Sequence, residues 1–418
     1  MKRGFGSSKV VSRIQSLVAT RNYPELSKAL CANGITDEKA WLSIVDSVLN
    51  LVDPKEPSGA SGVVIPSLVI ASAAGGHSLT YFQRNRIGDL AVSLFDSLSE
   101  FDKLVFTIGC SQAGLRTPSV VDFVSRFLTV SREGTQFSGI PEKFIPELLL
   151  AVATLGIDNQ LSWNQLLAKV DFENLTPHAL TQTALAIATS RTFPISAIER
   201  MIDGSVSRGG GEAFSFEDAL CFAHSLTCLE VFHTQLFRSL LVRISNAPTL
   251  EEDGKNILKQ IVISLFLDEK AKQITESISP IVLGKLDKFL DWSVPEPQRH
   301  HGLVAGEIQQ LISVDESDMV MKQPVAVGSI ADWTRESALS VAVDRFYVSD
   351  VLCSDPKLFV HIDDETYPDI IEGPLDPYLQ VKHLHLRTCG MKLVWIREQE
   401  WLELEDEEKK ELITNIHS

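Results

Sequence analysis

Basic side chains gather in one acid-free segment near the C-terminus. Residues 377–397 contain no aspartate or glutamate, whereas the stretches on both sides of them are acidic. The candidate contacts to nucleic acid in this segment are Lys382, His383, Arg387 and Lys392. Cations of this kind neutralise phosphates, and an aromatic side chain such as Trp395 or Tyr378 can stack on a base. The segment therefore predicts a local RNA-binding surface.

A second interpretation of the same cations stays open. The acidic turn at 363–365 precedes the segment, and opposite charges this close normally pair with one another. Under this interpretation Lys382 and Arg387 form ion pairs with that turn and contribute to folding. Trp395 and Trp401 then serve as anchors of the core, with Trp401 at the start of an acidic terminal helix.

Short elements of alternating type must position these side chains. Val, Ile, Phe and Tyr are concentrated at Phe346–Leu352 and Lys357–Ile362, which predicts two strands around a Ser-Asp-Pro turn. Pro377–Cys389 is predicted to be a helix that ends at Gly390, a residue suited to the left-handed conformation. Lys392–Ile396 is predicted to be a third strand.

The order of these elements resembles the RAP domain, an RNA-binding module abundant in apicomplexans. In that family a strand ends in an acidic turn, and a Lys-containing helix, a Gly, a short strand and a Glu-Trp pair follow. The matching positions here are Ile362-Asp363-Asp364, Lys382-His383-Leu384, Gly390, Lys392–Ile396 and Glu400-Trp401. Asp364 stands where the family usually has Gly, so the loop beyond it is expected to differ. The match covers about 60 of the 418 residues, and it implies RNA binding.

The RAP domain is similar in fold to very-short-patch-repair and PD-(D/E)xK nucleases. Those enzymes hold a divalent metal with two carboxylates and a lysine, so that the metal polarises the phosphate and activates water. Asp350 stands at the first carboxylate position, but His361 occupies the second, and Asp363 stands where lysine is expected. The resemblance implies a nuclease-like fold without cleavage. Asp350 and Asp363 would carry any remaining activity, and Mg²⁺ is expected only in that case.

Composition limits the classes of function. The hydrophobic content is 44% and the aromatic content 7%, which favours helices built from Leu, Ala, Val and Ile. The formal net charge of −17 is unusual for a general nucleic-acid binder, so any RNA contact must be local or made within a larger assembly. The six cysteines include no CxxC pair and are expected to be reduced core thiols. No apolar run approaches the ~20 residues of a membrane helix, so no membrane partner is expected.

One set of possible metal ligands shares a helical face, at Cys221, His224 and Cys228. No fourth ligand is evident beside them. Cys and His on an apolar helix are usually packed core residues, and no metal site is predicted.

The N-terminal 24 residues allow two interpretations. They contain five basic residues and no acid, with interspersed serines and apolar residues at helical spacing. This composition is typical of a mitochondrial presequence. The spacing of Ile14, Leu17 and Val18 equally fits an ordinary packed first helix. The RAP resemblance favours an organelle, with the mitochondrion first and the plastid as the alternative.

Residues 25–292 contain a recurring pattern of paired helices. Each unit has an apolar helix rich in small residues, a short break and a second apolar helix. The first helices are predicted at Val64–Gly76, Phe101–Leu115, Phe144–Ile157, Thr176–Thr192 and Phe216–Val231. Gly114, Gly156, Ser190 and Cys228 align at spacings of 34 to 42 residues, the range of helical-repeat units. An α-helical repeat array (α-solenoid) is predicted, and a non-repetitive helical bundle is the alternative.

The expected organisation is this array, a linker and transition at 293–342 with one helix near Leu303–Ile312, and a small α/β RAP module at 343–418. RAP domains commonly follow degenerate helical repeats in FASTK-like proteins and heptatricopeptide-type organelle factors. We therefore expect a non-catalytic mitochondrial RNA-binding protein that acts in RNA processing, RNA stability or ribosome assembly. A structural protein–protein adaptor, such as a ribosome-associated subunit, and a metal-dependent ribonuclease are the alternatives.

Overall fold

The computed structural model describes residues 5–32, 35, 37–53, 62–135, 137, 139–157, 159–190, 192, 194–292, 303–312, 329–347, 349, 358–363 and 377–417. These residues are mainly helical, and they contain two short strands. They fall into two compact units, of which the first ends at Met201 and the second begins at Ile202. Every helix within the described segments is too short or too polar to cross a membrane.

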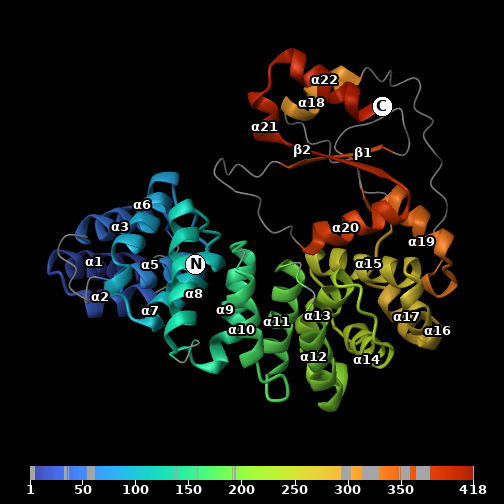
Figure 1. Cartoon of the computed structure of the whole chain (residues 1–418), viewed down its shortest axis with the longest axis horizontal. Helices are drawn as coiled ribbons and strands as arrows, with labels where there is room; N and C mark the ends of the chain where they lie inside the picture. The colour runs from blue at the N-terminus through green and yellow to red at the C-terminus, as the bar shows by residue number, and fades with distance from the viewer. Residues whose placement is uncertain are drawn as a thin grey trace. The chain divides into compact units, whose positions relative to one another are not determined.

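The first unit is built from antiparallel helices in two layers. Its helices are α1 Phe5–Ala19, α2 Tyr23–Ala32, α3 Glu38–Leu51, α5 Val64–Gly75, α6 Tyr81–Ser93, α7 Glu100–Gln112, α8 Pro118–Thr135, α9 Ile145–Thr154, α10 Gln160–Lys169, α11 Pro177–Ser190 and the start of α12 Ile195–Ser207. In one layer α2, α5, α7, α9 and α11 pack successively on one another, and in the other α3, α6, α8 and α10 do so (Figure 1). We call the first set the inner layer. This stacking of successive helix pairs is the architecture of a helical-repeat array.

Small residues explain how the inner layer packs so closely. A Cβ atom on Gly109 of α7 would lie 3.1 Å from the side chains of Val69 and Ile70 on α5. A larger residue at this position would push the side chains of α5 away by a few tenths of an ångström, so glycine favours the close approach of the two helices. The predicted small-residue stretches form inner-layer helices of the first unit and α13 (Phe216–Cys228) of the second.

The inner-layer helices also end in a common way. Gly76, Gly114 and Gly156 follow α5, α7 and α9 with φ angles of 62°, 60° and 63°. At each of them two backbone N–H groups donate back to carbonyls in the last turn, the Schellman arrangement. Glu230 takes the same place after α13 with a φ of 51°. The glycines that align in the sequence therefore mark the helix ends of successive repeats.

A second recurring contact is made by helices α8, α12 and α14 (Thr234–Ser245). Each of these helices carries an arginine whose guanidinium lies over the ring of a phenylalanine earlier in the chain. The pairs are Arg126 over Phe95 at 4.1 Å, Arg200 over Phe172 at 4.8 Å and Arg243 over Phe216 at 4.2 Å. These stacks supply a repeat signature that the sequence analysis did not identify.

The second unit continues with helices and adds a small parallel sheet. Its helices are α13, α14, α15 Glu252–Leu267, α16 Lys272–Ser277, α17 Pro280–Asp287, α18 Leu303–Ile312, α19 Arg335–Val341, α20 Pro377–Thr388, α21 Glu398–Glu403 and α22 Asp406–His417. Strands β1 (Leu358–Asp363) and β2 (Lys392–Arg397) pair in parallel, with His361 opposite Trp395. Helix α20 lies between the two strands in sequence, as a parallel pair requires a crossover connection. Short 3₁₀ turns occur at Phe95–Ser97, Glu142–Phe144, Gly210–Ala213, Glu269–Ala271 and Ile330–Asp332.

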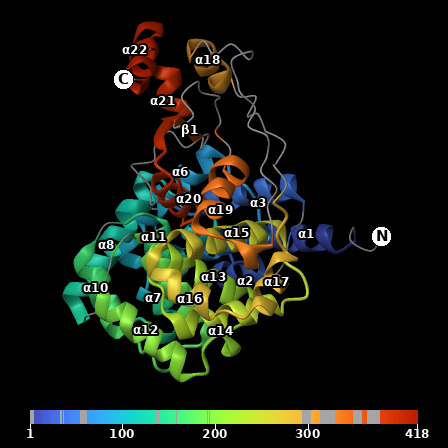
Figure 2. The ribbon, with the colours of Figure 1, turned by 90° about the vertical axis from the view of Figure 1, so that its right-hand side faces the viewer.

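The two faces of the sheet meet different partners. Leu358, Val360 and Ile396 join an apolar core with residues of α18, α21 and α22 (Figure 2). The members from those helices are Val304, Ile308, Trp401 and Ile413. The alternate residues of the strands point to the opposite face, toward α20. We call β1, α20, β2, α18, α21 and α22 together the C-terminal module.

Two predictions for this module were wrong where the structure describes the residues. Phe346 belongs to a π-helical turn, Ala342–Phe346, instead of a strand. This turn continues α19, which packs on α15, so tertiary packing overrides the strand preference of the aromatic residues. The acidic terminal segment forms two helices, and the first begins at Glu398, before Trp401. The rest of Phe346–Leu352, apart from Tyr347 and Ser349, lies outside the described residues.

The first helix packs within the array. Ile14 of α1 is completely buried, and α1 contacts α2 and α3. Residues 5–19 thus form the packed first helix that the apolar spacing allows. Their packing does not bear on targeting.

Candidate nucleic-acid interface in the C-terminal module

The two ends of helix α20 are specified by its own sequence. Pro377 occupies its first turn, where the missing N–H has no helical acceptor. At the other end the N–H of Gly390 donates to the carbonyl of Arg387 at 2.9 Å, and the N–H of Met391 to that of Leu386 at 2.9 Å. Gly390 has a φ of 74°, and a Cβ atom there would meet nothing within 4 Å. Backbone conformation alone therefore favours glycine, and it directs the chain from α20 into β2.

Histidine and aromatic rings cluster on the face of the sheet that meets α20. The rings of His361 and Trp395 lie 5.1 Å apart and nearly perpendicular. His383 of α20 makes the same contact with Trp395 at 5.1 Å. Nearby, Lys382 Nζ lies 4.9 Å from the centroid of the Phe359 ring. The rings of His361, His383 and Trp395 are all half-buried, so this cluster lies at the edge of the module's core.

The predicted RNA-binding residues differ in their exposure to solvent. Lys382 is only 9% exposed, and His383 is half-buried against Trp395. Arg387 and Lys392, on opposite sides of the Gly390 turn, are exposed. No ion pair joins Arg387 to a carboxylate of the described residues. Arg387 and Lys392 are therefore the members best placed to reach a phosphate.

A third basic residue of α20, His385, has a role that the sequence did not reveal. His385 is 1% exposed and connects to a buried polar network. Its Nδ1 lies 2.8 Å from the hydroxyl of Tyr347, and its Nε2 lies 2.6 Å from Ser264 Oγ on α15. Gln260 Nε2 donates to the Tyr347 hydroxyl at 3.2 Å, and Gln260 Oε1 lies 2.7 Å from His224 Nε2 on α13. We call these five residues the polar network.

One arrangement of protons satisfies every member of the polar network. Ser264 donates to the carbonyl of Gln260 at 2.9 Å, so its oxygen accepts from His385 Nε2–H. His385 Nδ1 then accepts from Tyr347, which in turn accepts from Gln260. Gln260 Oε1 accepts from His224 Nε2–H. The hydrogen bonds form a single directed chain in which every side chain is neutral.

With the protons placed in this way, His385 does not serve as a base for Ser264. Burial, reinforced by the nearby His224, lowers the pKa of His385 to about 3. The Nε2 atom that faces Ser264 already carries the proton, so His385 cannot act as its base. Burial also raises the pKa of Tyr347 well above its usual value. The polar network attaches α20 to α13 and α15.

The carboxylate candidates for nuclease activity are only partly visible. Asp350 lies outside the described residues, and Asp363 is the last residue of β1, opposite Arg397 in register. The predicted packed role of His224 fits its bond to Gln260. Cys228 Sγ donates to the carbonyl of Pro377 at 3.5 Å. Within the described segments, no group of His, Cys, Asp and Glu is placed to hold a metal ion.

Trp401 is an anchor of the core. It is completely buried, and its indole Nε1 donates to Glu307 Oε2 on α18 at 2.9 Å. Lys409 of α22 lies 3.0 Å from the same oxygen. The bonds from Trp401 and then Lys409 lower the pKa of Glu307 below its usual value. Helix α18, expected in the linker segment, is thereby joined to α21 and α22.

The helices rich in small residues that follow α2 offer phosphates no exposed cation. Helices α5, α7, α9, α11 and α13 contain one Lys or Arg between them, Lys103. Lys103 is 9% exposed, and its Nζ lies 4.1 Å from the centroid of the Phe95 ring. Burial lowers its pKa, with Asp96 and Glu100 opposing this shift. These helices are therefore not suited to hold an RNA backbone.

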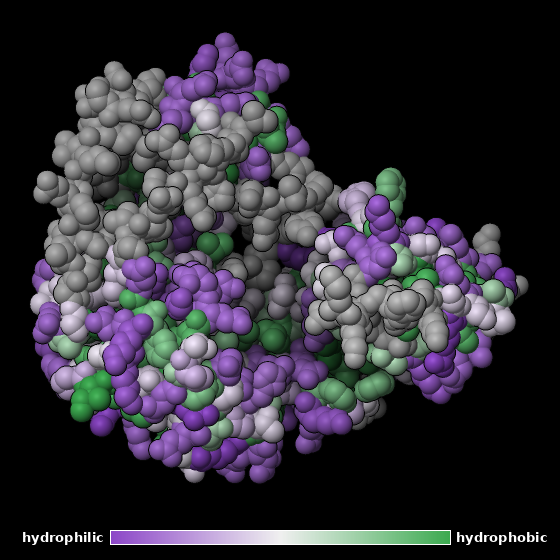
Figure 3. All heavy atoms as spheres, turned by 180° about the vertical axis from the view of Figure 1, so that it is seen from behind, coloured by the Kyte–Doolittle hydropathy of each residue, from purple (hydrophilic) through white to green (hydrophobic). Residues whose placement is uncertain are grey.

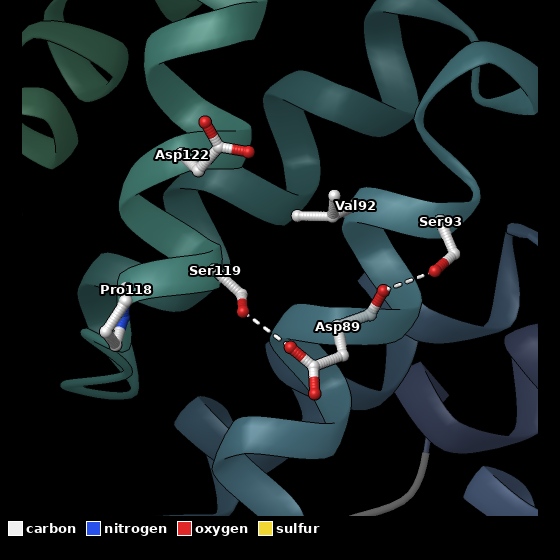
Figure 4. Close-up of a pocket in the computed structure, with 6 residues that line it drawn as sticks. All are labelled: Asp89, Val92, Ser93, Pro118, Ser119 and Asp122. Carbon is white, nitrogen blue, oxygen red and sulfur yellow. Dashed lines mark hydrogen bonds between the residues drawn. The ribbon is translucent and has the colours of Figure 1, made fainter.

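The surface of the array is acidic where it is hollowed between α6 and α8 (Figure 4). Asp89, Ser119 and Asp122 line this hollow of about 410 Å³. Ser119 donates to Asp89 Oδ1 at 2.5 Å, and Asp122 of the same helix also lines the hollow. Over the face drawn in Figure 3, hydrophilic residues cover most of the described surface, with hydrophobic ones scattered between them. A carboxylate-lined hollow repels phosphate and favours basic or neutral partners.

Comparisons with models of protein families and with curated proteins found no match to this sequence.

Proposed function

We propose that this protein is a non-catalytic organellar RNA-binding protein, whose RAP-type C-terminal module contacts the RNA. The observation that carries the proposal is the β1–α20–β2 unit. Its parallel strands and crossover helix agree with the small nuclease-like fold that the resemblance implies. Its Gly390 turn presents two exposed cations, Arg387 and Lys392, and half-buried Trp395 lies on the strand that follows, on the face toward α20. Such a group combines phosphate neutralisation with an aromatic surface.

Within this proposal the helical array serves as a scaffold. Helices α5, α7, α9, α11 and α13 contain no exposed cation, and the whole chain has a net charge of −17. RNA contact is therefore local, and the array positions the module within a larger ribonucleoprotein. RNA processing, RNA stability and assembly of the mitochondrial ribosome are the activities that such a protein would serve. We assign it to the mitochondrion, with the plastid as the alternative, because its first 24 residues are basic and acid-free.

The adaptor function is the second candidate. The specific observation in its favour is the acidic hollow of Asp89 and Asp122, together with the lack of an exposed cation in α5, α7, α9, α11 and α13. Under this function the array binds basic proteins, and RNA affinity is absent or unrelated to Arg387 and Lys392.

Charge neutralisation at the Gly390 turn tests the proposal. The double variant Arg387→Gln with Lys392→Gln should weaken binding of a labelled single-stranded RNA by the full-length protein. Loss of two phosphate contacts should reduce the slope of log affinity against log salt by about 1.4. Lys382 is left unchanged because it is mostly buried, and its replacement would disturb packing against Phe359.

The matched control is Lys270→Gln with Lys272→Gln, which removes the same charge from exposed positions. Equal affinity and slope in all three proteins would contradict the proposal and favour the adaptor function. Incubation of the labelled RNA with Mg²⁺ tests the ribonuclease alternative in the same preparation. Cleavage that Asp350→Asn abolishes would establish it.

A further inference from the structure

A lysine-lined hollow lies within the second unit, at one end of α14, α15 and α17. It has a volume of about 760 Å³ and is formed by the α14–α15 connection, the first turn of α15 and the end of α17. Its charged and polar lining includes Asn246, Lys255, Lys285, Lys288 and Asp291. The volume is in the range of sites that accept a nucleotide-sized ligand. We call it the lysine hollow.

Two of these lysines keep their charge available. Lys285 Nζ donates to Asn246 Oδ1 at 2.8 Å, and Asn246 Nδ2 donates to the carbonyl of Val242 at 3.0 Å. The amide of Asn246 is thus oriented by the backbone, and it holds Lys285 without neutralising it. Lys288 follows three residues later, so the two side chains are neighbours on the helix surface. No ion pair joins Lys285 or Lys288 to a carboxylate of the described residues.

The remaining charges only partly offset these cations. Lys255 pairs with Glu252 at 2.9 Å, and Asp291 lies on the lining. Three lysines and one aspartate line the hollow, whereas Glu252, Asp253 and Asp287 lie outside its lining, in a chain whose net charge is −17. A local excess of positive charge on an acidic protein marks a place where an anion is attracted.

An apolar wall completes the hollow. Ala247 and Leu290 are buried beneath it, and the ring of Phe289 is half-buried at its edge. An aromatic ring beside cations suits an anion that carries a flat hydrophobic group. A nucleotide has both parts, because its phosphate needs cations and its base stacks on aromatic side chains.

We infer that the lysine hollow is a second RNA-binding site, which takes single-stranded RNA with a phosphate between Lys285 and Lys288 and a base against Phe289. This inference rests on the proposed function and places an RNA contact in the helical part of the chain. The contact is made at one end of α17, whereas α5, α7, α9, α11 and α13 contain no exposed cation. A single-stranded RNA that contacts both the lysine hollow and the Gly390 turn would be bound at two separate sites.

The test compares three full-length double variants with the wild type. The double variant Lys285→Gln with Lys288→Gln removes the positive charges of these two lysines from the lysine hollow. Arg387→Gln with Lys392→Gln removes the cations of the C-terminal module, and Lys270→Gln with Lys272→Gln is the charge-matched control. The probe is a fluorescein-labelled 20-nucleotide oligouridylate titrated at several salt concentrations, with sodium tripolyphosphate as competitor. Ultraviolet crosslinking followed by mass spectrometry locates the bound RNA.

The first variant should bind the oligouridylate on the order of tenfold more weakly at 0.1 M salt, and its salt slope should fall by about 1.4. Crosslinks should include Phe289 in the wild type. Unchanged affinity and slope, with loss in the Arg387 and Lys392 variant, would overturn this inference and leave the proposed function standing. No RNA binding by the wild type would overturn both. Competition by tripolyphosphate without crosslinks at Phe289 would show a site for free phosphate, which contradicts an RNA site.

Discussion

The C-terminal module has two different kinds of contact, one inside it and one with the helices beside it. On one face of the sheet, Leu358, Val360 and Ile396 pack with Trp401 in an apolar core. On the other side, α20 meets α13 and α15 through the polar network centred on Gln260. Gln260 also donates to the carbonyl of Tyr378 at 2.8 Å, so it joins the first turn of α20 to α15. The two contacts have comparable burial but different chemistry.

The difference shows how each contact specifies its arrangement. Apolar burial is non-directional, and its stabilisation depends mainly on the area removed from water. The polar network permits one placement of α20, because each donor must face its acceptor and an unmatched buried group is costly. The apolar core therefore contributes mainly stability to the module, and the polar network fixes how the module is attached to the helices beside it.

Trp401→Ala should have the largest effect on stability. Removing a fully buried indole should cost about 3–5 kcal/mol through lost burial and the cavity left behind. Glu307 also loses the indole N–H that donates to it, and Lys409 Nζ loses the aromatic ring whose centroid lies 5.5 Å away. Hydrogen exchange should show lost protection in β2, α21 and α22, with α13 to α15 unchanged.

Trp401→Phe is the control for the hydrogen bond alone, and it should cost about 1–2 kcal/mol. A wild-type unfolding midpoint for Trp401→Ala would contradict the assignment of this residue to the core and would make it a candidate for base stacking.

Gln260→Leu should have the next largest effect. Leucine fills a similar volume, but His224 and the Tyr378 carbonyl lose their Gln260 partner in a buried environment. The expected cost is about 2–4 kcal/mol, with each unmatched group contributing about 1–3 kcal/mol. Ile261→Val, at a fully buried apolar position on the same helix, should cost only about 0.5–1.5 kcal/mol.

The location of the effect separates the two contacts further. In Gln260→Leu the amides of α20 should lose protection from hydrogen exchange, and those of α21 and α22 should keep it. Equal losses across the whole module would show that the polar network and the apolar core act as one contact.

Mildly acidic pH should weaken the polar network by less than the Gln260→Leu substitution does. The folded pKa of His385 is about 3 and the ordinary value is 6.5, so between these values the unfolded chain binds a proton that the folded chain does not. The free energy of unfolding therefore falls as the pH falls below 6.5, by up to about 1.4 kcal/mol per pH unit, and is restored above 6.5. At pH 5 the loss is about 2 kcal/mol.

The control for this effect is His385→Gln, which removes the titrating group. Chemical denaturation from pH 7 to pH 5 should show a shallower pH dependence in that variant than in the wild type. Parallel curves would show that His385 is accessible to protons in the folded protein.

The amino-acid sequence by itself determined the local elements. Small apolar runs specify the inner-layer helices, and glycines such as Gly114 and Gly156 end them because a positive φ costs glycine little. The helix from Pro377, its stop at Gly390 and the strand after it follow from the same local rules. Leu303–Ile312 was also identified as a helix from its own pattern.

Only the tertiary structure decided which side chains of these elements are buried and which distant residues they contact. Lys382, His383, His385 and Arg387 lie close together in sequence, yet packing buries Lys382 and His385 and leaves Arg387 exposed. The partners of His385 are Ser264 and Tyr347, 121 and 38 residues away along the chain. No local pattern encodes such a pairing, because the cost of burying a polar group depends on which distant atoms reach it in the folded chain.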